Sequence, residues 1–261
     1  MSRPTVFISG AAAGIGHATA RAFADLGYHV GAFDIDEPGL GLLREEIEAA
    51  GGSITVGALN VTDPAQWDAA MEKFHADEQR LDILINNAGV LSSGPFEEMA
   101  TAAHRRLVDI NVNGVIYGSK AAFPYLRDTA GAQLVNLCSA SAIYGQPELA
   151  TYSATKFAVR ALTEALDLEW RPHDIRVLAV WPLFVNTAMV DGMDIGTTRS
   201  LGIHLTAKDV ADGIVHATRT RSRLLHKVHY PIGRQAKIMA NLAKFSPDWA
   251  VRMSNKRMSH T

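Results

Sequence analysis

Short apolar runs alternate along the chain with longer stretches in which apolar residues lie three or four positions apart. Strands that alternate with helices form βαβ units, and these units place their strands in one parallel sheet. The sequence therefore predicts the α/β class, as a single doubly wound domain whose seven-stranded parallel sheet is flanked by helices. The expected strands are residues 5–9, 29–34, 53–58, 82–85, 133–138, 175–180 and 227–230, and the expected helices are residues 11–27, 38–50, 64–80, 102–128, 151–171 and 207–220.

The 261 residues include one Cys, and 20% of them are charged. A chain of this length buries enough surface for a core without disulfides, and a single Cys excludes an intramolecular disulfide and a Cys-rich zinc cluster. No run approaches the ~18 apolar residues of a membrane span, and the charged fraction is typical of an ordered protein. The first residues enter a strand-like run without the apolar segment of a signal peptide, so we expect a cytoplasmic protein.

Charge is distributed unevenly along the chain. Residues 1–218 carry 15 basic and 26 acidic residues, whereas residues 219–261 carry ten basic residues and one acid, Asp248. We therefore expect a catalytic body over residues 1–232 and a basic amphipathic helical extension of the same domain over residues 233–261. Three roles stay open for this extension: packing on the body or a second subunit, contact with an anionic membrane surface, and contact with an anionic substrate such as an acyl-CoA. The net charge of −2 and the lack of a recognition module argue against nucleic-acid binding.

A glycine-rich turn follows the first expected strand, with Gly10, Gly14, Ile15 and Gly16 at the start of a helix. Thr19 stands where a G-x-G-x-x-G string has its third glycine. The physical logic is nevertheless that of a dinucleotide site, because glycines permit a tight turn and let backbone N–H groups approach a pyrophosphate. An ordinary strand-to-helix turn is the alternative.

A carboxylate, Asp34, ends the second expected strand. At this position an acid can bind the two ribose hydroxyls of an adenosine. A 2′-phosphate would meet like charge there, and neither Ala13 nor Ile35 supplies a compensating cation. The sequence therefore favours NAD over NADP, with a strand-end Asp that caps a loop as the alternative.

Four further motifs follow the glycine turn in a fixed order. They are Asn86-Asn87-Ala88-Gly89 after the fourth expected strand, Asn111 within Asn-Val-Asn-Gly, Ser139 at the end of the fifth strand, and Tyr152-Ser-Ala-Thr-Lys156. With the glycine turn, these motifs resemble a classical short-chain dehydrogenase/reductase over residues 5–228. The resemblance implies a Rossmann-type fold and a nicotinamide cofactor.

Tyr152 and Lys156 lie four positions apart on an expected helix, so both side chains project from one face. A nearby ammonium lowers the pKa of a tyrosine from its usual ~10, which predicts that Lys156 makes Tyr152 a usable acid/base. Ser139 ends a parallel strand at the ligand-binding edge, where its hydroxyl can bond to a substrate oxygen. A packed ring beside a solvated amine is the alternative for the Tyr–Lys pair.

The resemblance assigns roles to these residues. It implies that Tyr152 exchanges the proton and that Ser139 orients the substrate oxygen. Lys156 would also hold the nicotinamide ribose, and Asn111 would hold a water in the proton relay. A homo-oligomer, a tetramer or a dimer, is further implied, packed through the helices at 102–128 and 151–171. The cofactor contacts expected are Gly10, Gly14, Ile15, Gly16, Asp34, Asn60, Val61, Asn87, Ala88, Gly89, Tyr152, Lys156, Pro182, Val185 and Thr187.

Two positions depart from the family pattern. Asn60 stands where the family usually has Asp, and its amide can both donate to and accept from an adenine. Leu183 follows Pro182 where the family usually has glycine, which restricts the backbone beside the nicotinamide and adds apolar bulk. Thr187 and the Val185 backbone are still expected to reach the carboxamide.

A glycine-interrupted apolar segment over residues 188–205 follows the cofactor motifs. Such a segment is expected to form a substrate lid, and its apolar character predicts a lipophilic substrate. Packing of these residues on the core or a second subunit is the alternative. The substrate contacts expected are Ser141, Ile143, Tyr144, Phe184, Met189 and Met193, with Leu183 lining the same pocket.

Together these features predict an NAD-dependent oxidoreductase that interconverts a secondary alcohol and a ketone on a fairly apolar molecule, with Tyr152 as general acid/base. No metal site is expected, because the histidines show no paired spacing. A non-catalytic NAD sensor or scaffold of the same fold is the main alternative. An epimerase or dehydratase would need further acid/base groups, which the sequence does not identify.

Overall fold

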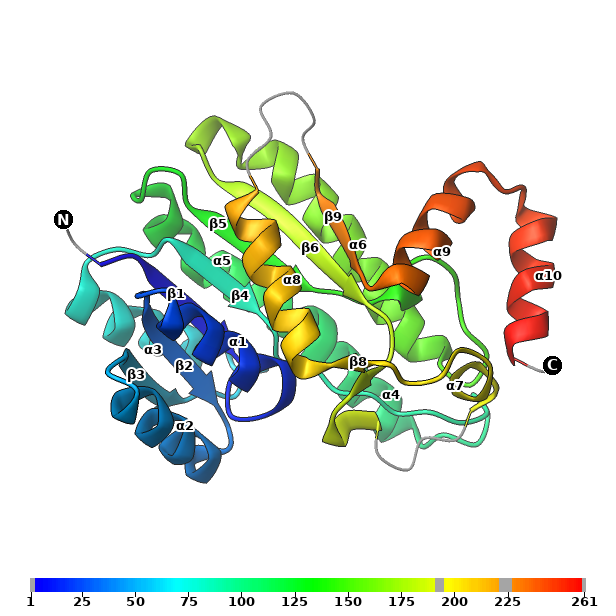
Figure 1. The fold of residues 1–261 in the computed structure, drawn as a ribbon, viewed down its shortest axis with the longest axis horizontal. Helices are drawn as coiled ribbons and strands as arrows, with labels where there is room; N and C mark the ends of the chain where they lie inside the picture. The colour runs from blue at the N-terminus through cyan, green and yellow to red at the C-terminus, as the bar shows by residue number, and fades with distance from the viewer. Residues whose placement is uncertain (1–2, 191–194, 221–226, 260–261) are drawn as a thin grey trace.

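The computed structural model describes residues 3–190, 195–220 and 227–259. Its main sheet has seven strands in the order β3-β2-β1-β4-β5-β6-β9, and every pair of neighbours is parallel (Figure 1). This confirms the predicted fold class. The strands are β1 (Thr5–Ser9), β2 (His29–Asp34), β3 (Ser53–Ala58), β4 (Ile83–Asn86), β5 (Gln133–Leu137), β6 (Arg176–Pro182) and β9 (His229–Ile232).

Helices cover both faces of this sheet (Figure 1). Successive residues of a strand point to opposite faces, so Val6 and Ile8 belong to one apolar core while Phe7 belongs to the other. Helices α1, α2 and α8 close the first core, and α3 and α5 close the second. The helices are α1 (Gly14–Asp25), α2 (Glu37–Ala49), α3 (Pro64–Glu78), α4 (Thr101–Val108), α5 (Gly114–Arg127), α6 (Ala150–Glu169), α7 (Gly196–Leu201), α8 (Ala207–Arg219), α9 (Arg234–Phe245) and α10 (Asp248–Ser259).

The stretch predicted as one helix over residues 102–128 is divided. A turn of π-helix, Asp109–Asn113, joins α4 to α5, and Asn111 lies in it. Such turns insert one residue into a helix and redirect the side chains around it. The predicted helical stretch is therefore confirmed, and its π-turn is a feature that the apolar spacing did not indicate.

The C-terminal part of the chain lies beside the open end of the sheet (Figure 1). A short parallel pair, β7 (Val185–Asn186) and β8 (Leu205–Thr206), flanks the segment that contains α7. Helix α9 buries Ala236 and Ala240 against the body, and α10 packs on α7. Within the described residues, no helix is both long and apolar enough to cross a membrane.

Candidate active site

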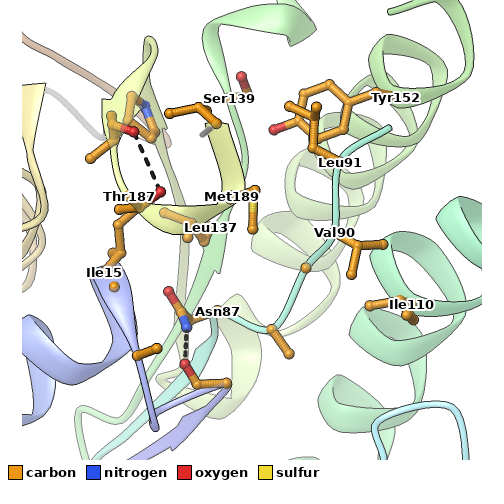
Figure 2. Close-up of a pocket in the computed structure, with 18 of the residues that line it drawn as sticks. Ile15, Asn87, Val90, Leu91, Ile110, Leu137, Ser139, Tyr152, Thr187 and Met189 are labelled. Carbon is orange, nitrogen blue, oxygen red and sulfur yellow. Dashed lines mark hydrogen bonds between the residues drawn. The ribbon is translucent and has the colours of Figure 1, made fainter. Parts of the chain in front are cut away.

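A cavity of about 360 Å³ lies at the carboxyl ends of the central strands (Figure 2). Its walls include residues at the ends of β1, β2, β4, β5 and β6. The strand order reverses between β1 and β4, and ligands of doubly wound sheets bind outside such a point. The topology thus places the cavity where a nucleotide site is expected.

Glycines shape one end of the cavity. Gly10 and Gly14 have φ of 68° and 56°, in the left-handed region that favours glycine. A Cβ at Gly16 would overlap the carbonyl oxygen of Gly10, so only glycine fits at this position in the first turn of α1. The Asn87 amide fastens this turn by donating to the carbonyls of Ser9 (3.0 Å) and Gly10 (2.7 Å). Figure 2 shows one hydrogen bond of this amide.

Asp34 lines the cavity at the end of β2. Its carboxylate accepts hydrogen bonds from the backbone N–H groups of Ala12 (3.0 Å) and Asp36 (3.1 Å). These bonds hold the acid against the glycine turn. The Asn60 oxygen accepts from the Thr62 N–H and hydroxyl, which leaves the Asn60 NH₂ group, and not the whole amide, to meet a ligand.

The predicted catalytic trio gathers at the other end of the cavity. Ser139, Tyr152 and Lys156 all line it, and Figure 2 shows the Ser139 and Tyr152 side chains beside one another. Lys156 is buried, its ammonium donates to the Leu137 carbonyl at 3.0 Å, and it lies 5.6 Å from the centre of the Tyr152 ring. The three groups converge because the end of β5 faces the first turns of α6.

The protonation of this trio differs from the sequence-based expectation. Burial raises the pKa of Tyr152 to about 12, against an opposing contact with the Ser139 hydroxyl. Burial also lowers the pKa of Lys156. The pKa of Tyr152 thus lies above its usual value and not below it as the sequence predicted, because the effect of burial exceeds that of the Ser139 hydrogen bond. At neutral pH the Tyr152 phenol is a proton donor.

Asn111 is buried but does not line the cavity. Its amide donates to the Val90 carbonyl and accepts from the Val90 N–H, both at 2.8 Å, and it also reaches the Thr155 hydroxyl. These bonds fix Val90, which does line the cavity. The expected water of a proton relay stays a prediction.

Most of the expected site residues line the cavity, and a few do not. Leu183, which takes the usual glycine position, lines the cavity and is not in the left-handed region, so its side chain costs no backbone strain. Ile143 and Tyr144 do not line the cavity, because Ile143 packs in two apolar clusters and the Tyr144 hydroxyl points to Met258 Sδ at 4.0 Å. Met193 lies outside the described residues. The expected residues that line the cavity are Gly10, Gly14, Ile15, Asp34, Asn60, Val61, Asn87, Ala88, Gly89, Ser139, Ser141, Tyr152, Lys156, Pro182, Phe184, Val185, Thr187 and Met189.

Several lining residues were not expected from the sequence. Val90 and Leu91 follow the Asn-Asn-Ala-Gly motif directly, so their place in the loop after β4 could have been predicted from that motif. Gln146 lies in the loop between Ser139 and Tyr152, both of which line the cavity. Arg106, on α4, adds a cation that no motif indicated.

The chemistry of the walls suits a dinucleotide. Glycines keep side chains away from the start of α1, where backbone N–H groups favour a pyrophosphate. Asp34 is held at the end of β2, where a carboxylate can bind a ribose. No group of three or more His, Cys, Asp or Glu side chains that could hold a metal occurs in the described part of the chain. The fold and the site together define a Rossmann-type dinucleotide-binding protein.

Comparisons with known proteins agree with this class. The family model for short chain dehydrogenases matches residues 4–196. A 3-alpha-(or 20-beta)-hydroxysteroid dehydrogenase of Mycobacterium bovis is 36% identical over 185 residues, 70% of each chain. A 3-oxoacyl-(acyl-carrier-protein) reductase of Thermotoga maritima is 35% identical over 184 residues, 70% of this chain and 75% of its own.

A solved structure is similar in fold. The 3-ketoacyl-(acyl-carrier-protein) reductase of Brucella melitensis, complexed with NADH, superposes with a TM-score of 0.80 at 27% identity, over 88% of this chain and 96% of its own. The chain therefore belongs to the short-chain dehydrogenase family and is an oxidoreductase of that family.

Proposed function

We propose that this protein is an NAD(H)-dependent oxidoreductase that interconverts a secondary alcohol and a ketone on a fairly apolar molecule. The observation that carries the proposal is the meeting of Ser139, Tyr152 and Lys156 in the same cavity as Asp34. A pure NAD sensor has no chemical need for a buried ammonium beside a phenol. The sensor hypothesis therefore stays the second candidate.

The chain's own residues supply the proton chemistry. In ketone reduction the protonated Tyr152 donates its proton to the substrate oxygen, and the Ser139 hydroxyl donates a hydrogen bond to the same oxygen. In alcohol oxidation the phenolate takes that proton back, beside the Lys156 ammonium. The bound nicotinamide supplies or accepts the hydride.

Asp34 supports the proposed preference for NAD. Its carboxylate is held by two backbone N–H groups and lines the cavity, so a 2′-phosphate would meet a fixed negative charge. A ribose with two hydroxyls can instead donate to it.

Apolar side chains support a lipophilic substrate. Leu91, Leu183, Phe184 and Met189 line the cavity around the Tyr152 end. The relative from Mycobacterium bovis is named for hydroxysteroids, and the relative from Thermotoga maritima for oxoacyl chains. Both names describe a carbonyl or carbinol on an apolar skeleton.

The test is absorbance of reduced nicotinamide, with the purified protein, NAD or NADP, and secondary alcohols graded from short aliphatic to steroid size. We expect turnover with NAD that improves with apolar size. Tight NAD binding without turnover of any alcohol or matching ketone would overturn the proposal and favour the sensor.

We also propose a homo-oligomer that packs through α5 and α6. Ile116 on α5 and Phe157 and Leu168 on α6 are exposed large apolar residues. Such residues on neighbouring helices fit a second copy of the chain. Sedimentation velocity should give a dimer or tetramer that Phe157→Glu dissociates, and a wild-type monomer would contradict this.

The C-terminal extension carries a separate proposal, contact with an anionic membrane surface. Ile238, Leu242, Phe245, Trp249 and Met253 are exposed, with Phe245 at 88% and Trp249 at 68%. Residues 233–261 hold six basic residues and one acid, which suits an anionic surface. The protein should sediment with phosphatidylserine vesicles more than with phosphatidylcholine vesicles, and Phe245→Ser should weaken this. Equal sedimentation would contradict the proposal.

A further inference from the structure

Gln146 is a buried amide in the wall of the cavity. It is 2% exposed, and it lines the same cavity as Ser139, Tyr152 and Phe184. Neither its side-chain oxygen nor its side-chain nitrogen has a hydrogen-bond partner in the described part of the chain. The proton transfer proposed for Tyr152, Ser139 and Lys156 does not involve this residue.

An unpaired buried amide is costly. Leaving one buried donor or acceptor without a partner costs about 1–3 kcal/mol, and most buried side-chain polar groups are paired. Gln146 leaves both unpaired in a wall that is otherwise rich in apolar side chains. Such an amide is ready to bond to a polar group that enters the cavity.

The Tyr144 hydroxyl neighbours the Gln146 amide but does not satisfy it. The Tyr144 hydroxyl has its pKa raised by burial to about 12, and the neighbouring Gln146 amide opposes that rise. The effect of Gln146 on that pKa is that of a hydrogen-bonding neighbour, but the two groups do not reach the distance and angle of a hydrogen bond. The Tyr144 hydroxyl lies instead at 4.0 Å from Met258 Sδ.

The backbone of Gln146 is fixed relative to the reacting groups. Its N–H donates to the Ser153 hydroxyl at 3.1 Å, and its carbonyl accepts from the Leu149 N–H at 3.2 Å. Ser153 follows Tyr152 in the first turns of α6, so these bonds tie Gln146 to the helix that carries the proton donor. The backbone from which the amide projects is therefore anchored to the helix that carries Tyr152.

We propose that Gln146 determines substrate specificity by binding a second polar group of the substrate. An amide both donates and accepts, so it suits a hydroxyl or a keto group. The substrate class is then an apolar molecule with two oxygen substituents, one at Tyr152 and one at Gln146. The inference rests on the proposed function and specifies its substrate.

The test compares the wild type with Gln146→Met, which keeps the length of the side chain and removes its polar atoms. The probes are a decalin ketone and the decalin diketone or hydroxyketone of the same carbon skeleton, each reduced with NADH. The measured quantity is the ratio of kcat/KM for the doubly oxygenated ketone to that for the simple ketone. We expect Gln146→Met to lower this ratio about tenfold to a hundredfold, since a hydrogen bond from the amide to the second keto group, or up to two bonds to a hydroxyl group, are lost.

Two further readouts separate recognition from a structural role. The melting temperature of Gln146→Met should equal or exceed that of the wild type, because an apolar side chain replaces an unpaired amide. The Kd for NADH should stay the same. The control Gln79→Met changes an exposed glutamine at the end of α3 and should leave the ratio unchanged.

Three outcomes would overturn the inference. An unchanged ratio would show that no second group meets Gln146. A lower melting temperature with equal losses for both ketones would make the amide structural, and a weakened NADH affinity would assign it to the cofactor. If the wild type reduces no ketone and oxidises no alcohol, the proposed function itself fails. That outcome is distinct from the others, because the ratio can be measured only when the wild type turns over both ketones.

Discussion

The two ends of the cavity differ in how their polar groups are held. At the nucleotide end, Asp34 and Asn87 bond to backbone groups of the protein itself. At the catalytic end, the Gln146 amide has no partner in the described residues, and burial shifts the pKa values of Tyr152 and Lys156. The nucleotide end is thus fixed by bonds within the protein, whereas the catalytic end holds a buried amide without a partner.

The nucleotide end of the cavity is rigid, and the reactive groups lie at the catalytic end. Bonds to backbone fix the glycine turn before any ligand arrives, which lowers the entropic cost of binding. Desolvated and unpaired groups lower the stability of a protein, and they are common in active sites. Changes at the nucleotide end should therefore affect binding, and changes at the catalytic end should affect turnover.

The largest effect on binding is expected for Gly16→Val. A Cβ at this position overlaps the Gly10 carbonyl, so the turn must move away from its pyrophosphate geometry. We expect the Kd for NAD to rise at least about a hundredfold, which corresponds to about 2.7 kcal/mol. Calorimetric titration measures this, and affinity within threefold of the wild type would show that the turn does not hold the cofactor.

Removal of the negative charge of Asp34 should change the preference between NAD and NADP. Asp34→Asn keeps an acceptor for the Ala12 N–H and removes the charge that a 2′-phosphate would meet. The ratio of kcat/KM for NAD to that for NADP should fall about tenfold or more. Initial rates with each cofactor give this ratio, and an unchanged preference would contradict the role of Asp34.

The raised pKa of Tyr152 predicts different pH profiles for the two directions. Oxidation needs the phenolate, whose fraction rises about tenfold for each pH unit below the pKa, which burial raises to about 12. Reduction needs the protonated phenol, and Tyr152 is already fully protonated at neutral pH. We expect kcat/KM for alcohol oxidation to rise between pH 6 and 9 while kcat/KM for ketone reduction stays flat. A plateau of oxidation below pH 7 would mean that the loaded enzyme has a much lower pKa.

The smallest effect is expected at a glycine outside both ends. Gly41 lies within α2, and a Cβ there meets no atom within 4 Å. Gly41→Ala should stabilise the protein by about 0.5–1 kcal/mol, because alanine loses less entropy in a helix. Urea unfolding measures this, while NAD affinity should stay the same. A large loss of affinity would mean that the turn and α2 are coupled.

The features predicted correctly from the sequence are those that depend on residues close together in the chain. The strands β1, β2 and β3 begin and end where the short apolar runs place them. The glycine turn and the Tyr152–Lys156 spacing are equally local, because each depends on a few residues of one element. These patterns are enough for the fold and for the nucleotide end.

The rest depends on tertiary packing that no local pattern records. The π-turn at Asp109–Asn113 inserts one residue without disturbing the apolar periodicity on either side. Ile143 and Tyr144 face apolar clusters and Met258, since distant elements cover that side of their loop. The pKa of Tyr152 depends on burial by the whole fold, and spacing to Lys156 could not give it.

The separation of binding from chemistry is tested most directly with Tyr152→Phe. Calorimetric titration with NADH and absorbance of reduced nicotinamide during turnover would be measured on the same preparation. We expect the Kd to stay within about threefold of the wild type while kcat falls roughly 10²- to 10⁴-fold, the usual contribution of a general acid. Normal turnover by Tyr152→Phe would contradict the account, because the proton would then come from another group.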